Sequence, residues 1–433
     1  MPDTASNDPS HLSQVRLLLE ELCCELCRFE HVAEHGLDPS SVRIDREYWL
    51  GHPEAFADIR VVPGPRPPYF VEIKYGYPRD VLLRHLRRKF SNPPRGIEGE
   101  SKIILVIDSE TCPDPRALET EAAPCLAPGL TLEIWTEAHF LELLRDRFKV
   151  EARSVRPADL LDIRQAIDRA KGYFAFGGST LADYDHDPLK AELLWHFGFW
   201  RLQQLRNAGR STPREILAPG YYRGVAVLLA DLCSFSSYVR DTPDAGTVRE
   251  SLTSFYSKSR YQIINNGGML YQFVGDEVIG FFGIPDQPAG FVRDALETAR
   301  SLVSIGESVA HQWQRNIDRI QPSGGLHMGL AIGDLQVVSL RPFSRTHIGA
   351  IGDCINMAAR LMAVAGPGEV VVSNSFYQAL DEGGQVGFEA IEPIEAKNIG
   401  RIKAWKLSGK TIFEENAVAD PDAPAGGGDP FSS

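Results

Sequence analysis

The sequence has no apolar run that approaches the roughly 18 residues needed to cross a bilayer. Its first residues also lack the basic stretch followed by an apolar stretch that marks a secretory signal peptide. Both absences favour a cytoplasmic protein that does not span a membrane. At ~100–200 residues per domain, the 433 residues predict two or three domains rather than a single module.

Cysteine is scarce, and its seven occurrences are odd in number and scattered along the chain. This pattern excludes a disulfide framework and fits a reducing compartment. Cys24 and Cys27 do form a C-x-x-C pair, but they lie within a helical apolar pattern with no second Cys or His pair nearby. We interpret them as small buried thiols rather than zinc ligands.

Positive charge is in deficit, because 45 Lys and Arg face 58 Asp and Glu and give a formal net charge of −13. This balance argues against broad electrostatic binding to nucleic acid or anionic lipid. A local basic patch stays possible, and the stretch 79–90, with several arginines, is the candidate.

The first 150 residues predict an α/β domain. Between Leu12 and Leu37 apolar residues recur at three- and four-residue spacing, which is typical of one helix face. Short apolar runs bounded by turn residues predict strands at 56–62, 69–74, 102–107 and 130–135, and helices are predicted at 79–90 and 138–148.

Two helical segments, 158–175 and 188–207, predict a helical coupling segment over 151–218. A second mixed α/β domain is predicted over 219–409, because strand and helix patterns alternate there. The tail, 410–433, is rich in Pro, Gly, Ala and Asp and has too few apolar residues to predict a fold.

Two aspartates of the second domain stand at strand ends. The apolar strand VAVLLADL presents Asp231 at its end, and Asp276 lies in a Gly-Asp turn between predicted strands 269–274 and 278–282. Either residue alone is typical of a cap or a turn. Together, two carboxylates at the same end of adjacent strands can hold two divalent cations about 3.5–4 Å apart. This pair therefore predicts phosphoryl-transfer chemistry.

A further polar pair lies in the segment HIGAIGDCINMAARLMAVA, which reads as a strand, a turn and a helix. Asn356 and Arg360 are four residues apart, so they share one helical face. The arginine can be an ordinary surface ion-pair partner. Alternatively, the arginine neutralises a transferring phosphate and the asparagine orients a sugar.

The order and spacing of VLLADLCSFSSYV, FVGDEVIGFFG and IGDCINMAARLMAVAGPGEVVVS resemble the catalytic domain of class III nucleotide cyclases, over about Gly220 to Leu407. The resemblance implies a ferredoxin-like domain in which Asp231 and Asp276 bind two Mg²⁺ or Mn²⁺ ions, with the Leu232 carbonyl as an additional ligand. It further implies attack of the ribose 3′-hydroxyl on the α-phosphate with release of pyrophosphate.

The same resemblance implies roles for the other motif residues. Arg360 would stabilise the transition state, Asn356 would position the ribose, Lys397 in EAKNIG would hold the triphosphate, and Phe235 would contact the substrate. The family works as a head-to-tail dimer, with the aspartates from one subunit and the Asn-Arg pair from the other. A homodimer with two shared sites is therefore expected.

The base-selecting positions depart from the purine patterns of the family, which has Lys for adenine or Glu for guanine four residues before the second metal aspartate. Here that residue is Gln272, and the second selecting position is Gly349. Tyr222 lies where the first strand would border the base pocket, either filling it or packing as an ordinary strand residue. An amide can donate and accept, so Gln272 can complement uracil or cytosine.

This combination is similar to the pyrimidine cyclases of bacterial Pycsar anti-phage systems. It implies conversion of UTP, or next CTP, to cyclic UMP or cyclic CMP, a second messenger for a separate effector. Two alternatives stay open: an adenylyl cyclase with an atypical base pocket, and a nucleotide-binding regulator without turnover.

In the first domain, Asp58 on one predicted strand and Glu72 with Lys74 on the next resemble the core of restriction-endonuclease-like domains. That resemblance implies either a retained nuclease or a sensing and regulatory domain on the same fold. Glu-x-Lys alternation is also common on half-exposed strands. Any nucleic acid partner is expected at this domain.

Overall fold

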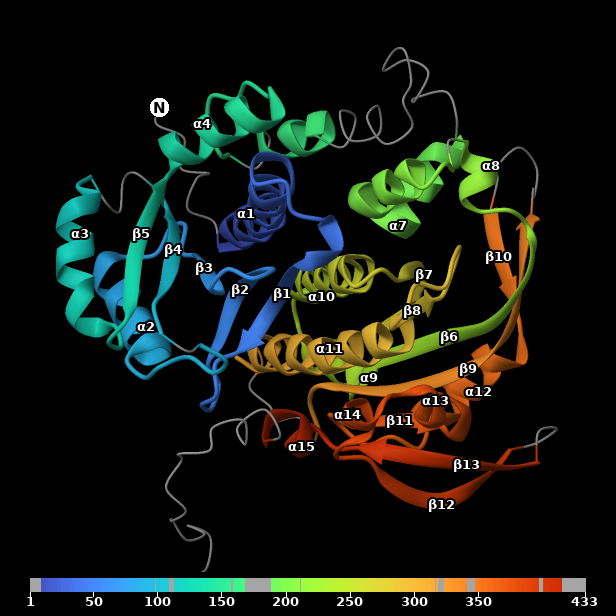
Figure 1. Ribbon diagram of the computed structural model, residues 1–433. Coiled ribbons are helices and arrows are strands. Elements are labelled where there is room, and N and C mark those ends of the chain that lie inside the picture. The colour runs from blue at the N-terminus through green and yellow to red at the C-terminus, as the bar shows by residue number, and fades with distance from the viewer. Residues whose placement is uncertain are drawn as a thin grey trace, which may run out of the picture.

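The computed structural model describes residues 9–97, 99–108, 113–156, 159–167, 188–210, 212–315, 317, 323–340, 347–396 and 400–414. These residues build two sheets, one of five strands and one of eight, with helices packed on both (Figure 1). Within this part of the chain, no helix combines the length and apolar character that crossing a membrane requires. The mixed α/β class expected from the sequence is confirmed.

The first sheet has the order β1-β2-β3-β4-β5, antiparallel from β1 to β3 and parallel from β3 to β5. Its elements are α1 (Pro9–Phe29), β1 (Val42–Trp49), β2 (Phe56–Pro63), β3 (Tyr69–Ile73), α2 (Arg79–Phe90), β4 (Ser101–Ile107), α3 (Pro115–Ala122), β5 (Leu130–Thr136) and α4 (Glu137–Phe148). The four predicted strands differ from these bounds by no more than one residue at either end. That this sheet belongs to a restriction-endonuclease-like domain stays a prediction.

Strand β1 has no predicted counterpart, because its sequence VRIDREYW carries charged residues where a strand pattern would need apolar ones. Asp45, Arg46 and Glu47 are nonetheless buried. Their charges are paired with residues of α1 and of the second domain, so the burial of this strand depends on distant partners.

Both faces of the first sheet are covered. Val71 and Ile104 pack with α1 and α4, whereas Phe70 and Leu105 face α2 and α3 on the other side. Two-sided burial explains why the central strands read as continuous apolar runs. Cys23, Cys24 and Cys27 are fully buried free thiols in the α1 side of this core, as interpreted from the sequence.

The second sheet has the order β12-β13-β11-β9-β6-β8-β7, and β10 pairs with β9. Its elements are α7 (Pro188–Asn207), α8 (Pro213–Ile216), β6 (Gly220–Leu232), α9 (Phe235–Asp241), α10 (Ala245–Asn265), β7 (Met269–Val274), β8 (Glu277–Phe282), α11 (Phe291–Gln314), β9 (Leu326–Leu340), β10 (His347–Ile351), α12 (Asp353–Met362), β11 (Val370–Ser373), α13 (Asn374–Ala379), α14 (Glu382–Gln385), β12 (Glu389–Ala396) and β13 (Gly400–Leu407).

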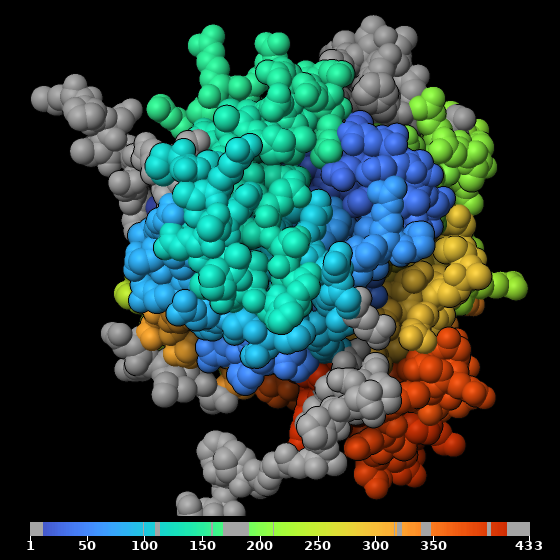
Figure 2. All heavy atoms as spheres, turned by 60° about the vertical axis from the view of Figure 1, so that its left-hand side comes forward, coloured from blue at the N-terminus to red at the C-terminus, as the bar shows by residue number. Residues whose placement is uncertain are grey.

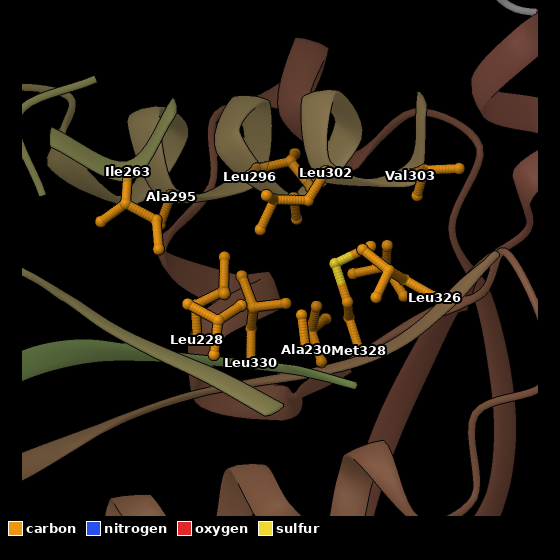
Figure 3. Packing of buried hydrophobic residues seen from close by; sticks show 14 of the residues in the cluster. Leu228, Ala230, Ile263, Ala295, Leu296, Leu302, Val303, Leu326, Met328 and Leu330 are labelled. Atoms are coloured by element: carbon orange, nitrogen blue, oxygen red, sulfur yellow. The ribbon is translucent and has the colours of Figure 1, made fainter. Parts of the chain in front are cut away.

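Strand β6 lies in the middle of this sheet and contributes side chains to the hydrophobic cores on both of its faces. Leu228 and Ala230 point toward α10 and α11, where they meet Leu296 and Leu302 (Figure 3). Val227 and Leu229 point to the opposite face, which is covered by α7 and α12. Gly329 lets α12 approach, because a Cβ there would lie 2.0 Å from the Ala358 carbonyl oxygen.

The predicted tail begins later than expected. Residues 410–414 belong to helix α15 (Gly409–Glu414), in which Ile412 is buried. The Phe413 ring packs edge-on against Trp49 of the first domain, with ring centroids 5.0 Å apart. These two apolar residues extend the fold, and the tail beyond residue 414 lies outside the described residues.

The coupling segment is described only in part. Residues 159–167 are helical, and Leu160, Ile163 and Ile167 are buried in the core of the first domain. The remainder of the predicted helix 158–175 lies outside the described residues. Helix α7 instead packs on the second sheet, with Gly198 in a left-handed conformation inside it.

The two domains meet where α1 and β1 pack against α10 and α11 (Figure 1). On the surface, blue atoms of the first domain lie directly beside yellow atoms of the second (Figure 2). The contact is polar and buried. The Arg46 guanidinium lies 2.5 Å from Glu20 and donates to Ser257 at 2.9 Å, and Lys258 pairs with Glu47. A buried charge network of this kind fixes the relative position of the domains, because each unpaired charge would cost several kcal/mol.

Candidate active site

Asp231 and Asp276 lie together at one end of the second sheet. Asp231 is the penultimate residue of β6 and is paired across the ladder with Glu277, the first residue of β8. Asp276 directly precedes Glu277 in the β7–β8 turn, and Gly275, at φ 66°, provides the left-handed conformation of that turn. The two carboxylates are close enough for the charge of Asp231 to raise the pKa of Asp276. The proximity predicted from the sequence is therefore present.

The electrostatics of this pair are those of two carboxylates held close together. Burial and the negative charge of Asp231 raise the pKa of Asp276 to about 7. Burial and Asp231 also raise the pKa of Glu277. Such a like-charge pair is relieved by a divalent cation, for which carboxylate oxygens are preferred ligands. Asp231 and Asp276 therefore fit the divalent ions that class III cyclases use.

His327 is a neighbour of this pair that the sequence analysis missed. It stands opposite Asp231 in the β6–β9 ladder, and its Nε2 lies 3.2 Å from Asp231 Oδ2. The hydrogen bond to Asp231 raises the pKa of His327, although burial opposes it. Only the register of two strands that are about 95 residues apart in sequence reveals this contact.

Tyr256 on α10 holds the turn from the other side. Its hydroxyl donates to the Gly275 carbonyl, and its ring stacks on Phe273 with centroids 4.1 Å apart. The position of Asp276 therefore depends on α10 as well as on the hairpin itself.

Asn356 and Arg360 lie on α12, which is anchored to the sheet by Ala358, Leu361 and Met362. Asn356 is exposed and Arg360 is half-buried. Among the described residues, no hydrogen bond or ion pair joins either side chain to Asp231 or Asp276. Lys397 lies outside the described residues.

Gln272 and Gly349 lie on β7 and β10, two strands that approach each other on the α7–α12 face of the sheet. The Ala350 amide donates to the Tyr271 hydroxyl at 3.2 Å, and each of these residues is next to a predicted base-selecting position. After a bulge in β7, Gln272 pairs with Ile279 of β8, whose side chain lies on the face that α7 and α12 cover. The fold thus brings both positions to one region.

Three further residues with predicted roles toward the substrate or the metal ions, Tyr222, Phe235 and Leu232, make packing contacts within the protein. The Tyr222 hydroxyl donates to the Ala218 carbonyl at 2.8 Å and its ring packs on the core, which is the ordinary strand packing that the sequence left open. Phe235 packs edge-on against Trp313, with centroids 5.8 Å apart. Leu232 is 6% exposed. Their roles toward a substrate or an ion stay predictions.

The predicted cluster of the first domain is also assembled. Lys74 Nζ lies 2.6 Å from Asp58 and 2.7 Å from Glu72, and all three side chains are largely buried. A fourth member, Lys89 of α2, lies 3.3 Å and 2.7 Å from the same two carboxylates. Although burial opposes ionisation, the two ammonium groups hold the pKa of Asp58 below its usual range.

Known proteins are similar to part of this chain. The uncharacterized protein Rv1320c of Mycobacterium tuberculosis is 26% identical over 166 residues, which cover 36% of this chain and 27% of that protein. The chain therefore spans about a quarter of the length of this relative. Among solved structures, the adenylyl cyclase CyaB from P. aeruginosa has a TM-score of 0.39 and 20% identity, over 44% of this chain and 96% of that one. The guanylate cyclase domain of RhGC from Catenaria anguillulae has a TM-score of 0.35 and 18% identity, over 43% and 97%.

A family model supplies the assignment. Residues 218–409 match the model described as "Adenylate and Guanylate cyclase catalytic domain". This range includes β6, the β7–β8 hairpin and α12, the elements that carry the carboxylate pair and the Asn-Arg pair. The second domain of this chain accordingly matches the adenylate and guanylate cyclase catalytic domain family over its full length.

Proposed function

We propose that the protein is a metal-dependent nucleotide cyclase that converts a pyrimidine nucleoside triphosphate, UTP first and CTP next, to its 3′,5′-cyclic monophosphate and pyrophosphate. The observation that carries the cyclase activity is the Asp231–Asp276 pair, held at one end of the sheet of a cyclase catalytic domain. The base preference is supported by Gln272 and Gly349, which are uncharged and lie on strands that approach each other.

In the reaction, the ribose 3′-oxygen bonds to the α-phosphorus as the bond to the β-phosphate oxygen breaks and pyrophosphate leaves. Two Mg²⁺ or Mn²⁺ ions, held by Asp231, Asp276 and the Leu232 carbonyl, would supply activation of the hydroxyl and neutralisation of phosphate charge. The chain's own residues do the remaining work. Arg360 stabilises the negative charge that develops on the transferring phosphate, Asn356 positions the ribose, and Lys397 binds the triphosphate.

A homodimer with shared sites completes this machinery. The exposure of Asn356 leaves its side chain accessible to a second copy, and this supports a site whose other half comes from that copy. A head-to-tail arrangement places the Asn-Arg pair of each subunit against the aspartates of its partner, which gives two equivalent sites.

The first domain serves in this proposal as a regulatory domain, and the product as a second messenger of anti-phage defence for a separate effector. The buried polar contact between the domains supports regulation. Ser257 and Lys258 on α10 bind the first domain, and Tyr256 beside them holds the turn that carries Asp276.

The test is incubation of the purified chain with ATP, GTP, CTP and UTP separately, with Mn²⁺ or Mg²⁺, and identification of the products by mass. Asp231→Ala is the matched inactive control. Cyclic UMP, or next cyclic CMP, is the expected main product. Cyclic AMP as the main product would replace the pyrimidine assignment with an adenylyl cyclase, and no product from any triphosphate would indicate a nucleotide-binding regulator.

A further inference from the structure

A cavity of about 650 Å³ lies between the two domains, away from the Asp231–Asp276 pair. The first domain contributes residues of α1, β2, β3 and α2 to its wall, and the second domain contributes residues of α10 and α11. Its size is within the range of roughly 300–1,000 Å³ that is usual for small-molecule sites.

The cavity is positively charged in an acidic protein. Its wall holds seven Lys and Arg against five Asp and Glu, whereas the whole chain has 45 against 58. Arg88 on α2 and Arg249 on α10 are both exposed, and neither forms an ion pair within the described residues. They come from different domains, so exposed guanidinium groups line the cavity from both sides.

Lysines form the floor of the cavity. Lys74 and Lys89 are 6% and 9% exposed, and both contact Asp58 and Glu72. Two ammonium groups balance two carboxylates, and Lys89 Nζ lies between the carboxylates, where a bridging cation would otherwise lie. The cluster itself is therefore electrically neutral, and the positive charge available to an anion comes from the other residues that line the cavity.

The electrostatic effect is visible at His85, which lines the same wall. Burial and the charges of Lys74, Arg88 and Lys89 lower the pKa of His85 to about 4. A further positive charge is therefore disfavoured at this point, and a negative charge is favoured.

We infer that this cavity binds a phosphate-bearing ligand of nucleotide size, with Arg88 and Arg249 as its guanidinium contacts from the two domains. Arginine is suited to this role because its planar donors match phosphate oxygens in pairs. The ligand is either a free nucleotide or the phosphorylated end of a nucleic acid, since both present the same group.

A ligand that contacts Arg88 and Arg249 together favours one relative position of the two domains. Helix α10 carries Arg249 at the cavity and Tyr256 at the turn beside Asp276. Ligand binding at Arg249 can therefore alter the position of Asp276 through helix α10. This consequence rests on the proposed cyclase function, whereas binding itself does not.

The test measures binding to the full chain by calorimetry, in EDTA so that no metal-bound nucleotide forms at the Asp231–Asp276 pair. The probes are AMP, UMP and a 5′-phosphorylated single-stranded DNA of twelve nucleotides. We expect at least one probe to bind, and Arg88→Ala and Arg249→Ala each to weaken it by at least about tenfold. Arg84→Ala on α2 and Arg240→Ala on α9 are exposed matched controls and should bind as the natural chain does.

Binding of AMP or UMP identifies a free nucleotide as the ligand, and binding of the oligonucleotide alone identifies a nucleic acid end; either result supports the site. The inference is overturned if no probe binds, or if the Arg88 and Arg249 variants bind as tightly as the two controls. Thermal melting of every variant separates lost binding from lost folding. Because no turnover is measured, failure of the cyclase proposal leaves this result unaffected.

Discussion

Lys258 on α10 and Glu47 on β1 form an ion pair across the boundary between the two domains, and only 3% and 5% of their side chains are exposed. The second carboxylate oxygen of Glu47 accepts a hydrogen bond from Ser308 on α11 at 2.7 Å. The charge of Glu47 in the first domain is therefore satisfied by two helices of the second domain. Loss of Lys258 leaves the buried Glu47 carboxylate without its cation, whereas Lys258 also has Glu20 at 3.7 Å.

Lys258→Met is expected to lower the free energy of unfolding by about 3–5 kcal/mol, because Glu47 would stay buried without its cation. Denaturant unfolding followed by circular dichroism measures the change. Arg84→Ala removes an exposed ion pair of α2 and should change stability by less than about 0.5 kcal/mol. The double variant Lys258→Met/Glu47→Leu should recover part of the loss, and equal effects of Lys258→Met and Arg84→Ala would refute the role of the pair.

Asp231→Ala and Arg360→Ala chains are each expected to be inactive, but an equal mixture should recover activity. In a mixed dimer one of the two shared sites keeps both residues, so random exchange should restore about a quarter of the natural activity. The measurement is product formation after mixing, with heterodimers verified by two affinity tags. Inactive mixtures that contain proven heterodimers would contradict shared sites.

His327→Ala is expected to raise the Mn²⁺ concentration needed for half-maximal activity by about 10–100-fold, because a partner that orients a ligand carboxylate typically contributes that much. His327→Gln keeps a side-chain donor near Asp231 and should recover much of the affinity. A titration of activity with Mn²⁺ at fixed substrate separates the two variants. A purely structural role would instead lower the melting temperature and leave the metal dependence unchanged.

Gln272→Lys is expected to move base preference from pyrimidine toward ATP, because adenylyl cyclases of the family carry Lys at the corresponding position. The ratio of kcat/KM for ATP to that for UTP should rise by at least about tenfold, the scale of one misplaced hydrogen-bonding group. Competition between the two triphosphates in one reaction gives the ratio directly. An unchanged ratio would show that Gln272 does not contact the base.

His85→Gln is expected to reduce the loss of stability in acid. The pKa of His85 is lowered to about 4, below the value of 6.5 in the unfolded chain. As the pH falls below 6.5, His85 becomes protonated in the unfolded state but stays neutral in the folded state. The free energy of unfolding therefore declines between about pH 6.5 and 4. Melting temperatures across this range should fall less steeply for His85→Gln than for the natural chain, and parallel curves would contradict the assignment.

Local sequence signals determined much of this protein. The strand at 102–107 was predictable because a central strand covered on both faces needs a continuous apolar run. The strand at 56–62 was predictable because its buried residues alternate with less buried ones, and the helix at 79–90 because its apolar residues follow the helical period. Asp231 and Asp276 were predictable as a pair, because each follows an apolar strand and the motif order resembles that of one family.

The tertiary structure decided what depends on contacts between distant residues. Strand β1 has a polar sequence but is buried, because Glu20 and Lys258 neutralise its charges and Ser257 accepts a hydrogen bond from Arg46. His327 meets Asp231 through strand register, and Lys89 joins Lys74 because α2 packs over β3. Arg88 and Arg249 line one cavity only after the two domains meet. Burial and pairing of charge are properties of the assembled chain, since the cost of a buried charge depends on which partner the fold brings to it.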